Sequence, residues 1–471
     1  MLARSETARA DDRGLTALAA QIGSALVLSI AGGAAIAMTG DWQIALGLLV
    51  GSLFVGLGLL QPALFVAVLL TVRPLLDGRA TTVSQLLGIL LIGVCALVLA
   101  TRPKIVRPRA IIAFSALLIV SALASLPSLL ELRGVIGLRP LTELVRLTAL
   151  FAMYLLAAQV VTTPVALRRV FLIVGLSGVL PAVSAINELI HNPDQAQVLG
   201  LVRVSGTFVN PVALSSYLAL CILIVLNLPR EDMPRWLRWS ALSLMTAALI
   251  ASYGREGWVL LLLGIVLLNW RQRRRMIAGV AVVCAGFVML VPGVQARVLP
   301  SADPGASETK TFASYDWRIK NWEGLLGRYA ERPLTGWGLK STEAVNPRRP
   351  FGAERDADGG FQAHNAIVRA LVEGGLLLLG AVLAFFATMI ATLWRIVRTG
   401  AKELTLYARV LAAGWLAMLV VALSTDDLLD ATALVYAMLA LTGALEGVHR
   451  RMRTDSPAPA DLRSPAFGRS T

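Results

Sequence analysis

Residues 366–394 read AIVRALVEGGLLLLGAVLAFFATMIATLW, and in this segment only Arg369 and Glu373 are charged. A helix needs about 20 apolar residues to cross a bilayer, so this segment is long enough to span a membrane. The residues that follow it, Arg395–Lys402, carry three basic side chains and no acidic one. An apolar segment that ends in such a cluster is typical of a membrane-spanning helix that ends in the cytoplasm.

Similar apolar segments recur along the whole chain of 471 residues. Hydrophobic residues make up 56% of the sequence and charged residues 15%, whereas a soluble domain carries about 25% charged residues. We therefore predict an all-α, polytopic transmembrane helix bundle of about 12–14 spans. The spans are expected near Leu15–Met38, Trp42–Leu60, Pro62–Leu75, Val83–Ala100, Ala110–Leu126, Leu141–Val161, Val165–Ile190, Pro211–Leu228, Trp236–Ser252, Gly257–Trp270, Met276–Val291, Ala366–Trp394, Leu406–Leu423 and Ala431–Leu445. The region Trp42–Leu75 is read either as two crossings or as one crossing and a re-entrant piece.

The distribution of lysine and arginine among the short loops predicts the orientation of these spans. The connector Arg271–Arg275 is the strongest cytoplasmic marker, and alternation from it puts four further basic loops on the same side. These loops are Arg102–Arg109, Thr162–Arg169, Pro229–Arg238 and Arg395–Lys402. Both basic termini then lie in the cytoplasm, which requires an even number of spans. The N-terminal apolar segment is read as a retained span and not as a signal peptide, because it is long for a signal sequence.

This topology divides the chain into five parts. We expect a cytoplasmic tail (1–14), the first part of the bundle (15–293), a large periplasmic loop (294–364), the last helices (365–447) and a disordered cytoplasmic tail (448–471). The large loop is expected to contain short helices, among them a helix over Asp316–Tyr329 that Ser314 or Asp316 caps. Two tryptophans on that helix favour a position at the membrane interface. A turn over Arg332–Lys340 is expected to pack against it, and Phe351–Gly360 reads as a flexible flap.

The formal charge of +14 has two interpretations, the cytoplasmic bias of a membrane protein or an anionic substrate. Nucleic acid is a weak third one, because no basic run lies on a soluble domain. The three cysteines lack the spacing of a metal site, and nucleotide-binding or zinc-protease motifs are not found. The sequence therefore predicts no metal and no cofactor.

Polar residues at the predicted outer ends of spans are the candidates for chemistry. Arg203, Arg255 and Arg318 lie on the side where the positive-inside bias disfavours arginine, and a guanidinium fits phosphate oxygens in pairs. Such residues near a helix N-terminus suit a diphosphate. His364 is the candidate catalytic residue, because a nearby imidazole suits proton transfer from a hydroxyl. Supporting positions are Asn210, Asn365 and Glu373.

Each of these residues also has an interpretation without a catalytic role. An outer arginine can reach the lipid headgroups or pair with Glu188 or Glu256. A histidine at a helix start is often a cap or a surface residue. Glu373 can simply bond a neighbouring helix, and Asp426 can be a solvated loop charge.

At the same residues, the sequence resembles the O-antigen ligase and polysaccharide polymerase superfamily of bacterial inner membranes. The resemblance rests on ordered motifs around the candidate residues and on the large loop between them. The motifs are Arg203…Gly206-Thr-Phe…Asn210-Pro211, Ser252-Tyr-Gly-Arg255, Arg318…Trp322, Arg332-Pro-Leu-Thr-Gly336-Trp-Gly338 and His364-Asn365…Leu371-Val-Glu373-Gly-Gly375. They cover the chain from about Arg203 to Leu445.

The resemblance implies a membrane-embedded glycosyltransferase of the GT-C type. Such an enzyme moves a glycan from an undecaprenyl-diphosphate carrier to an acceptor hydroxyl on the periplasmic face, with inversion and without a metal. It implies that Arg203 and Arg255 hold the diphosphate, that Arg318 assists and that His364 handles the proton. The acceptor is lipid A-core for a ligase, a growing glycan for a polymerase, or protein for an O-oligosaccharyltransferase. A transporter or flippase of lipid-linked glycans is the rival class.

Overall fold

The structure is a computed structural model that describes residues 56–454, except 59, 78–80, 102–104, 192–196, 199–200, 270–307, 348–361 and 427–431. Several predictions lie outside the described residues. They are the N-terminal tail, the spans Leu15–Met38 and Met276–Val291, most of Trp42–Leu60, the basic connector Arg271–Arg275, the flap Phe351–Gly360 and the tail after Thr454.

The described part of the chain is almost entirely helical, which confirms the prediction of an all-α bundle. Its helices are α3 (Pro62–Leu76), α4 (Thr81–Thr101), α5 (Ile111–Glu131), α6 (Arg133–Ile136), α7 (Arg139–Val160), α8 (Pro164–Ser177), α9 (Val179–His191), α10 (Pro211–Asn227), η1 (Arg230–Asp232), α11 (Arg235–Ala251), α12 (Arg255–Asn269), α15 (Glu308–Glu331), α16 (Thr342–Val345), α17 (Ala366–Thr399), α18 (Lys402–Val421) and α19 (Ala433–Thr454). A two-residue antiparallel ladder joins β1 (Gln197–Val198) to β2 (Leu201–Val202), with Gln197 opposite Val202.

Five helical segments among the described residues are long and apolar enough to cross a membrane. They are Ile111–Glu131, Arg139–Val160, Pro164–His191, Ala366–Thr399 and Lys402–Val421. Three shorter apolar helices, Pro62–Leu76, Gln85–Thr101 and Pro211–Asn227, accompany them. The chain is thus a polytopic membrane protein, and the described helices begin and end close to the predicted spans.

Small residues let the central helices approach closely. Gly443 and Gly447 of α19 lie one turn apart, and a Cβ atom at either position would collide with the carbonyl oxygen of Tyr154 or Ala158 on α7. Close approach through small residues is the usual way in which membrane helices gain packing energy. An aromatic cluster packs beside this contact, where Phe385 on α17 meets Phe114 on α5 with ring centroids 4.8 Å apart.

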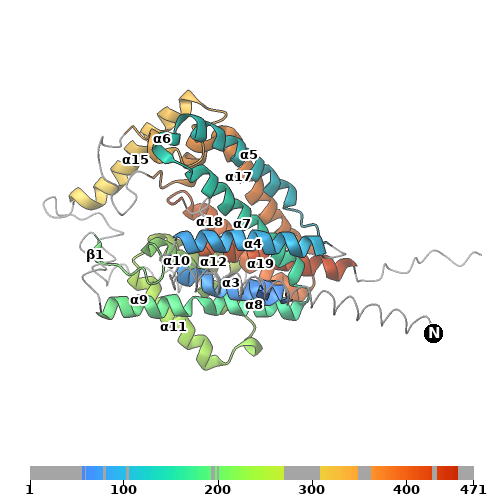
Figure 1. The fold of residues 1–471 in the computed structure, drawn as a ribbon. Coiled ribbons are helices and arrows are strands. Elements are labelled where there is room, and N and C mark those ends of the chain that lie inside the picture. The colour runs from blue at the N-terminus through green and yellow to red at the C-terminus, as the bar shows by residue number, and fades with distance from the viewer. Residues whose placement is uncertain are drawn as a thin grey trace, which may run out of the picture.

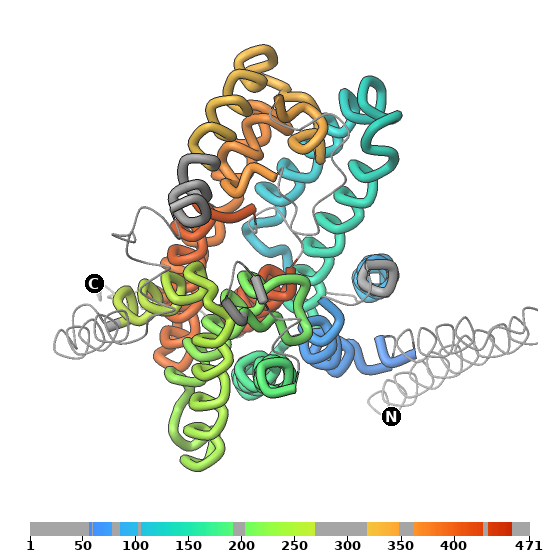
Figure 2. The backbone as a smooth tube through the Cα atoms, turned by 90° about the vertical axis from the view of Figure 1, so that its left-hand side faces the viewer, coloured from blue at the N-terminus to red at the C-terminus, as the bar shows by residue number. Residues whose placement is uncertain are grey.

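The two ends of the bundle differ in structure. In Figure 1, α6, α15 and β1 lie at the left-hand end, and the red C-terminal part of α19 lies at the opposite end. Figure 2 looks along the bundle from that left-hand side and shows α15, in gold, beside the orange start of α17. The large loop and the start of α17 therefore share one end of the molecule.

Helix α17 is interrupted near this end. Gly375 has φ 62° and ψ −157°, a region that essentially only glycine occupies. The turn Arg332–Lys340 docks on the interruption through backbone bonds: the amide of Trp337 donates to the carbonyl of Val372 at 2.8 Å, and the amide of Leu376 donates to that of Pro333 at 2.9 Å. The turn also packs against α15, as predicted, because Trp337 Nε1 donates to the carbonyl of Arg328 at 2.8 Å.

Some predicted boundaries in the loop and the tail are wrong. Helix α15 spans 24 residues from Glu308, so it is not short and neither Ser314 nor Asp316 caps it. The segment upstream of Asp316 is largely polar, so hydropathy does not register that the helix continues there. At the other end, α19 continues to Thr454, so residues 448–454 are helical and the predicted disordered tail cannot begin at 448.

Candidate functional site

The carboxylate of Asp426 holds the backbone of His364 at the N-terminus of α17. Asp426 accepts two hydrogen bonds there, from the backbone amide of His364 at 3.0 Å and from that of Asn365 at 3.2 Å. His364 has φ +49°, a conformation that is uncommon outside glycine. Asp426 is only 5% exposed, so the interpretation of this residue as a solvated loop charge is wrong. Its carboxylate fixes the backbone that carries the imidazole.

Asn365 is the N-cap of α17. Its side-chain oxygen accepts from the amides of Ile367 and Val368, and its Nδ2 donates to the carbonyl of Leu423 at 3.1 Å. This is the ordinary role of asparagine at a helix start. The amide of Ala366 also donates to the carbonyl of Ala422, at 2.9 Å. The free carbonyl groups at the end of α18 thus meet the free amides at the start of α17.

Helix α15 fixes the residues just before His364. Asn321 Nδ2 donates to the carbonyl of Gln362 at 3.1 Å, and Trp322 Nε1 donates to that of Ala363 at 2.7 Å. Trp322 packs with Leu325, Ala363 and neighbouring residues in a small apolar cluster. The partly buried indole of Trp322 therefore packs against the segment that precedes His364.

Arg318 lies one turn before Trp322 on α15 and faces the same region. Its guanidinium donates to the carbonyl of Ser424, with an N–O distance of 3.4 Å. Ser424 follows α18 and precedes Asp426 by two residues. The loop helix and the end of α18 thus bring Arg318 to the segment that holds His364.

Arg255 and Glu256 form the first turn of α12. The N-terminus of α12 lies against that of α10, because a Cβ atom on Gly257 would come within 2.5 Å of Ser215, and one on Gly254 within 3.1 Å of the Pro211 carbonyl. Two helix N-termini therefore lie side by side near Arg255. Free amides and aligned dipoles at such ends favour an anion.

The side chain of Arg203 binds a backbone carbonyl group in the same region. Its Nε donates to the carbonyl of Ser252 at 3.3 Å, three residues before Arg255. Glu188 lies in the same part of the structure. Its carboxylate accepts from the amides of Ser205 and Gly206 at 3.0 and 2.7 Å, and so holds the loop after Arg203. Asn210 caps α10, where its side chain accepts from the amide of Ala213.

The charges of these groups act on one another. The pKa of His364 is lowered to about 4, first by burial and then by the charge of Arg318, while the charge of Glu256 opposes the change. Burial also lowers the pKa of Arg318, with Glu256 and Asp426 raising it and Arg255 lowering it. His364 is therefore neutral at neutral pH and able to accept a proton. Arg255, Glu256, Arg318, His364 and Asp426 make up one electrostatic cluster.

Glu373 lies farther along α17, in a second charged group. Its carboxylate accepts from Thr342 Oγ1 at 3.0 Å and pairs with Arg369 at 3.2 Å. Arg369 also lies 3.9 Å from Glu143 on α7, and Lys340 lies 3.2 Å from the same glutamate. Lys340, Thr342, Arg369 and Glu373 line a polar cavity of about 50 Å³ that Ala363 and Asp426 also border. Arg369 Nη1 donates to the carbonyl of Asp426 at 3.5 Å, so this group is connected to the His364 cluster through Asp426.

The structure thus assembles part of the predicted set. It brings His364, Arg318 and Arg255 together and attaches Arg203 beside them, while Asn210 and Asn365 act as helix caps. Sequence reasoning missed Glu256 and Asp426 as site residues. The acidic segment with no lysine or arginine, Thr425–Asp430, was the available signal for Asp426. Within the described residues, no group of three or more histidine, cysteine, aspartate or glutamate side chains is arranged to hold a metal ion.

One comparison with known proteins bears on these residues. A search of curated proteins finds no match to the chain. The family model for O-antigen ligase matches residues 240–383, a segment that runs from within α11, through α12 and the large loop, into α17. It contains Arg255, Arg318 and His364 with Asn365 and Glu373, and it leaves Arg203 and Asn210 outside. Over residues 240–383 the chain is therefore similar to the O-antigen ligase family, and this match supports the resemblance to the O-antigen ligase and polysaccharide polymerase superfamily.

Proposed function

We propose that this protein is an inverting, metal-independent glycosyltransferase. It takes a glycan from an undecaprenyl-diphosphate carrier and transfers it to an acceptor hydroxyl on the periplasmic face of the inner membrane. The acceptor is lipid A-core or a growing surface polysaccharide. The observation that carries the proposal is the clustering of Arg255, Arg318 and His364 within a membrane protein that is similar to the O-antigen ligase family.

The diphosphate of the donor would bind at the start of α12. Arg255 and Arg318 supply guanidinium groups there, Arg203 lies beside them, and the N-termini of α10 and α12 supply free amides. These groups match the charge of a diphosphate, and they stabilise it further as it leaves and gains charge. Glu256 and Asp426 offset the mutual repulsion of the cations when the donor is absent.

His364 would then accept the proton of the incoming hydroxyl. The acceptor oxygen forms a bond to the anomeric carbon while the bond from that carbon to the diphosphate oxygen breaks on the opposite face. The hydroxyl proton passes to the imidazole, and the diphosphate leaves on its lipid. The pKa of His364 is about 4 in the free protein, and one cause is the charge of Arg318. A bound diphosphate neutralises that charge, so it raises the pKa and strengthens the base.

The test uses the purified full-length protein in liposomes with undecaprenyl-diphosphate glycan and an acceptor, without ATP or added metal. We expect glycosylated acceptor and undecaprenyl diphosphate as products. His364→Ala should lower turnover by about 100-fold or more, whereas His191→Ala, at an exposed histidine at the end of α9, should not. Arg255→Lys should also be impaired, since lysine lacks the paired donors.

Two outcomes would refute the proposal. Full activity of both His364→Ala and Arg255→Lys would show that the cluster is not the site. Movement of labelled donor lipid across the vesicle membrane, with no transfer and no effect of His364→Ala, would identify a flippase instead. Transfer to protein serine or threonine in the same assay would point to an O-oligosaccharyltransferase.

A further inference from the structure

A second polar cavity lies at the other end of the bundle. It has a volume of about 780 Å³ and is formed by the segment before α5, the end of α17 and the end of α19. Thr392 on its wall and Asn365 belong to opposite ends of α17. This segment of 34 residues is long and apolar enough to cross a bilayer, whose hydrocarbon core is about 30 Å thick. The cavity and His364 therefore lie toward opposite faces of the membrane.

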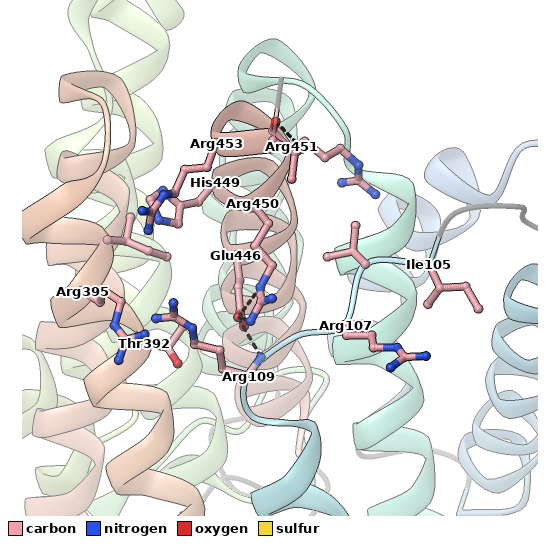
Figure 3. A pocket seen from close by; sticks show the side chains of 13 residues that line it. Ile105, Arg107, Arg109, Thr392, Arg395, Glu446, His449, Arg450, Arg451 and Arg453 are labelled. Carbon is pink, nitrogen blue, oxygen red and sulfur yellow. Dashed lines mark hydrogen bonds and ion pairs between the residues drawn. The ribbon is translucent and has the colours of Figure 1, made fainter. Parts of the chain in front are cut away.

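The lining of this cavity is strongly basic. Six arginines contribute to it: Arg107, Arg109, Arg395, Arg450, Arg451 and Arg453. His449 is a further lining residue, and Glu446 is the one acidic side chain in the lining. Figure 3 shows that these side chains approach from three separate segments of the chain.

The carboxylate of Glu446 is already engaged. It accepts from Tyr154 at 2.5 Å, from the backbone amide of Arg109 at 2.8 Å and from Arg450 at 3.0 Å. It is 2% exposed, so it serves to join α19, α7 and the segment before α5. This one negative charge pairs with Arg450, and among the described residues no ion pair involves Arg107, Arg109, Arg395 or Arg453.

Most of the remaining guanidinium groups have no acidic partner in the described part of the chain. Arg451 is directed to the backbone, since it donates to the carbonyls of Val161 at 3.0 Å and Gln159 at 2.8 Å. For the side chains of Arg107, Arg109, Arg395 and Arg453, the described residues provide no hydrogen bond or ion pair. The positive-inside bias explains why these arginines are cytoplasmic. It does not explain why they surround a common cavity.

We propose that this cavity is a binding site for a phosphate-bearing anion at the cytoplasmic face. Guanidinium groups from three segments suit a ligand with several phosphate oxygens, because each group donates paired hydrogen bonds. The volume is in the range of sites for small ligands, about 300–1,000 Å³. The ligand would hold the ends of α17 and α19 and the segment before α5 together.

Two sources supply this chemistry on the cytoplasmic side. One is the headgroup of an anionic phospholipid, since basic pockets between membrane helices bind such headgroups. The apolar lining residues Ile105 and Ile396 would then contact the acyl chains. The other is a soluble polyphosphate. The proposal concerns a site far from His364 and does not depend on glycan transfer.

The test measures binding to the full-length protein in nanodiscs. One arm titrates inorganic pyrophosphate in phosphatidylcholine nanodiscs. The other compares retained cardiolipin by native mass spectrometry after purification from mixed nanodiscs. The site variant is Arg109→Gln/Arg395→Gln. The matched control is Arg235→Gln/Arg398→Gln, which removes two exposed arginines that lie outside the cavity.

We expect the site variant to weaken binding by about tenfold or more, and the control by less than about twofold. Binding of cardiolipin alone identifies a lipid site, and binding of pyrophosphate alone identifies a soluble ligand. The single change Arg453→Gln, at the exposed end of α19, should weaken binding as well, which guards against misfolding of the double variant. The proposal is overturned if neither probe binds the wild-type protein, or if control and site variants lose binding equally.

Discussion

The interruption of α17 at Gly375 gives the sharpest prediction for the fold around the site. Gly375→Ala should destabilise the protein because alanine cannot adopt φ 62° and ψ −157° without strain. A Cβ atom there would also overlap the backbone of Leu334 in the docked turn. Either the helix or the turn must then move. The turn follows α15 in the chain and contacts the part of α17 around Glu373.

The structure sets the size of this effect. Backbone strain of this kind costs about 1–3 kcal/mol. Displacement of the turn would break the amide–carbonyl bonds of Trp337 with Val372, Gly338 with Glu373 and Leu376 with Pro333, which measure 2.8, 2.8 and 2.9 Å, at about 1 kcal/mol each. We therefore expect a loss of about 4–6 kcal/mol if the turn detaches fully, and about 1–3 kcal/mol if only the strain remains.

The assay is a thermal unfolding scan of the purified protein at one scan rate, with tryptophan fluorescence as the signal. Gly375→Ala should lower the unfolding midpoint by about 4–6 °C if the turn detaches and by about 1–3 °C if only the strain remains, because a chain of 471 residues shifts by about 1 °C per kcal/mol. Gly380→Ala is the matched control on the same helix, because nothing lies within 4 Å of a Cβ atom there. Alanine favours a helix interior over glycine, so the control midpoint should stay or rise. Equal midpoints for Gly375→Ala and wild type would refute the account of the docked turn.

Three further predictions concern charged and titratable groups. The pKa of His364 is lowered from 6.5 to about 4, so between these pH values the unfolded chain takes up a proton that the folded protein does not. The contribution of His364 to stability should therefore be complete above pH 6.5 and fall toward pH 4. In pH-dependent unfolding, His364→Asn should remove this slope, whereas His191→Asn should not. Asp426→Ala should lower glycan transfer by more than about tenfold, because the two amides that it holds lose a charged acceptor; unchanged transfer would contradict the role given to it. Glu143→Gln should cost about 1.5–3 kcal/mol, because it removes the charge of a buried carboxylate that pairs with Lys340 and Arg369, whereas Glu131→Gln, at an exposed pair, should have a much smaller effect in the same unfolding assay.

Hydropathy and helix length predicted most of the described fold. The predicted span Pro211–Leu228 is α10 (Pro211–Asn227), and the predicted start of α17 at Ala366 is the observed one. These ends were predictable because asparagine or proline marks the helix start, and because an apolar segment ends where polar residues begin. The same reasoning placed the start of α15 too late, since a polar helix outside the membrane leaves no hydropathy signal.

The interruption at Gly375 illustrates a different limit. Two consecutive glycines in an apolar segment are compatible with close helix packing and with a break in the helix. The docked turn decides between these outcomes, because it supplies partners for the backbone groups that the break leaves free. A partner about 40 residues away along the chain is not visible in the local pattern.

The candidate site was predictable in its cations and not in its anions. Arginine on the predicted outer side conflicts with the positive-inside bias, so Arg203, Arg255 and Arg318 stood out. A carboxylate on that side does not conflict with the positive-inside bias, so this bias did not single out Glu256 and Asp426. Their importance comes from burial, at 9% and 5% exposure, and burial depends on how α12, α15 and α18 pack around the start of α17.

The arginines at the two ends of the bundle differ in how often they pair with a carboxylate, a difference that the net charge of +14 does not reveal. At the end that holds His364, recorded partners are close: Arg332 pairs with Glu131 at 2.7 Å and Arg369 with Glu373 at 3.2 Å. At the opposite end, Arg109 and Arg395 line a cavity without an acidic partner among the described residues. An arginine that already pairs with a carboxylate adds little affinity for an anionic ligand, because the ligand must either displace that carboxylate or be repelled by it. An anionic ligand at the end that holds His364 must therefore rely on the few arginines around that residue, whereas Arg107, Arg109, Arg395 and Arg453 at the opposite end have no ion pair among the described residues.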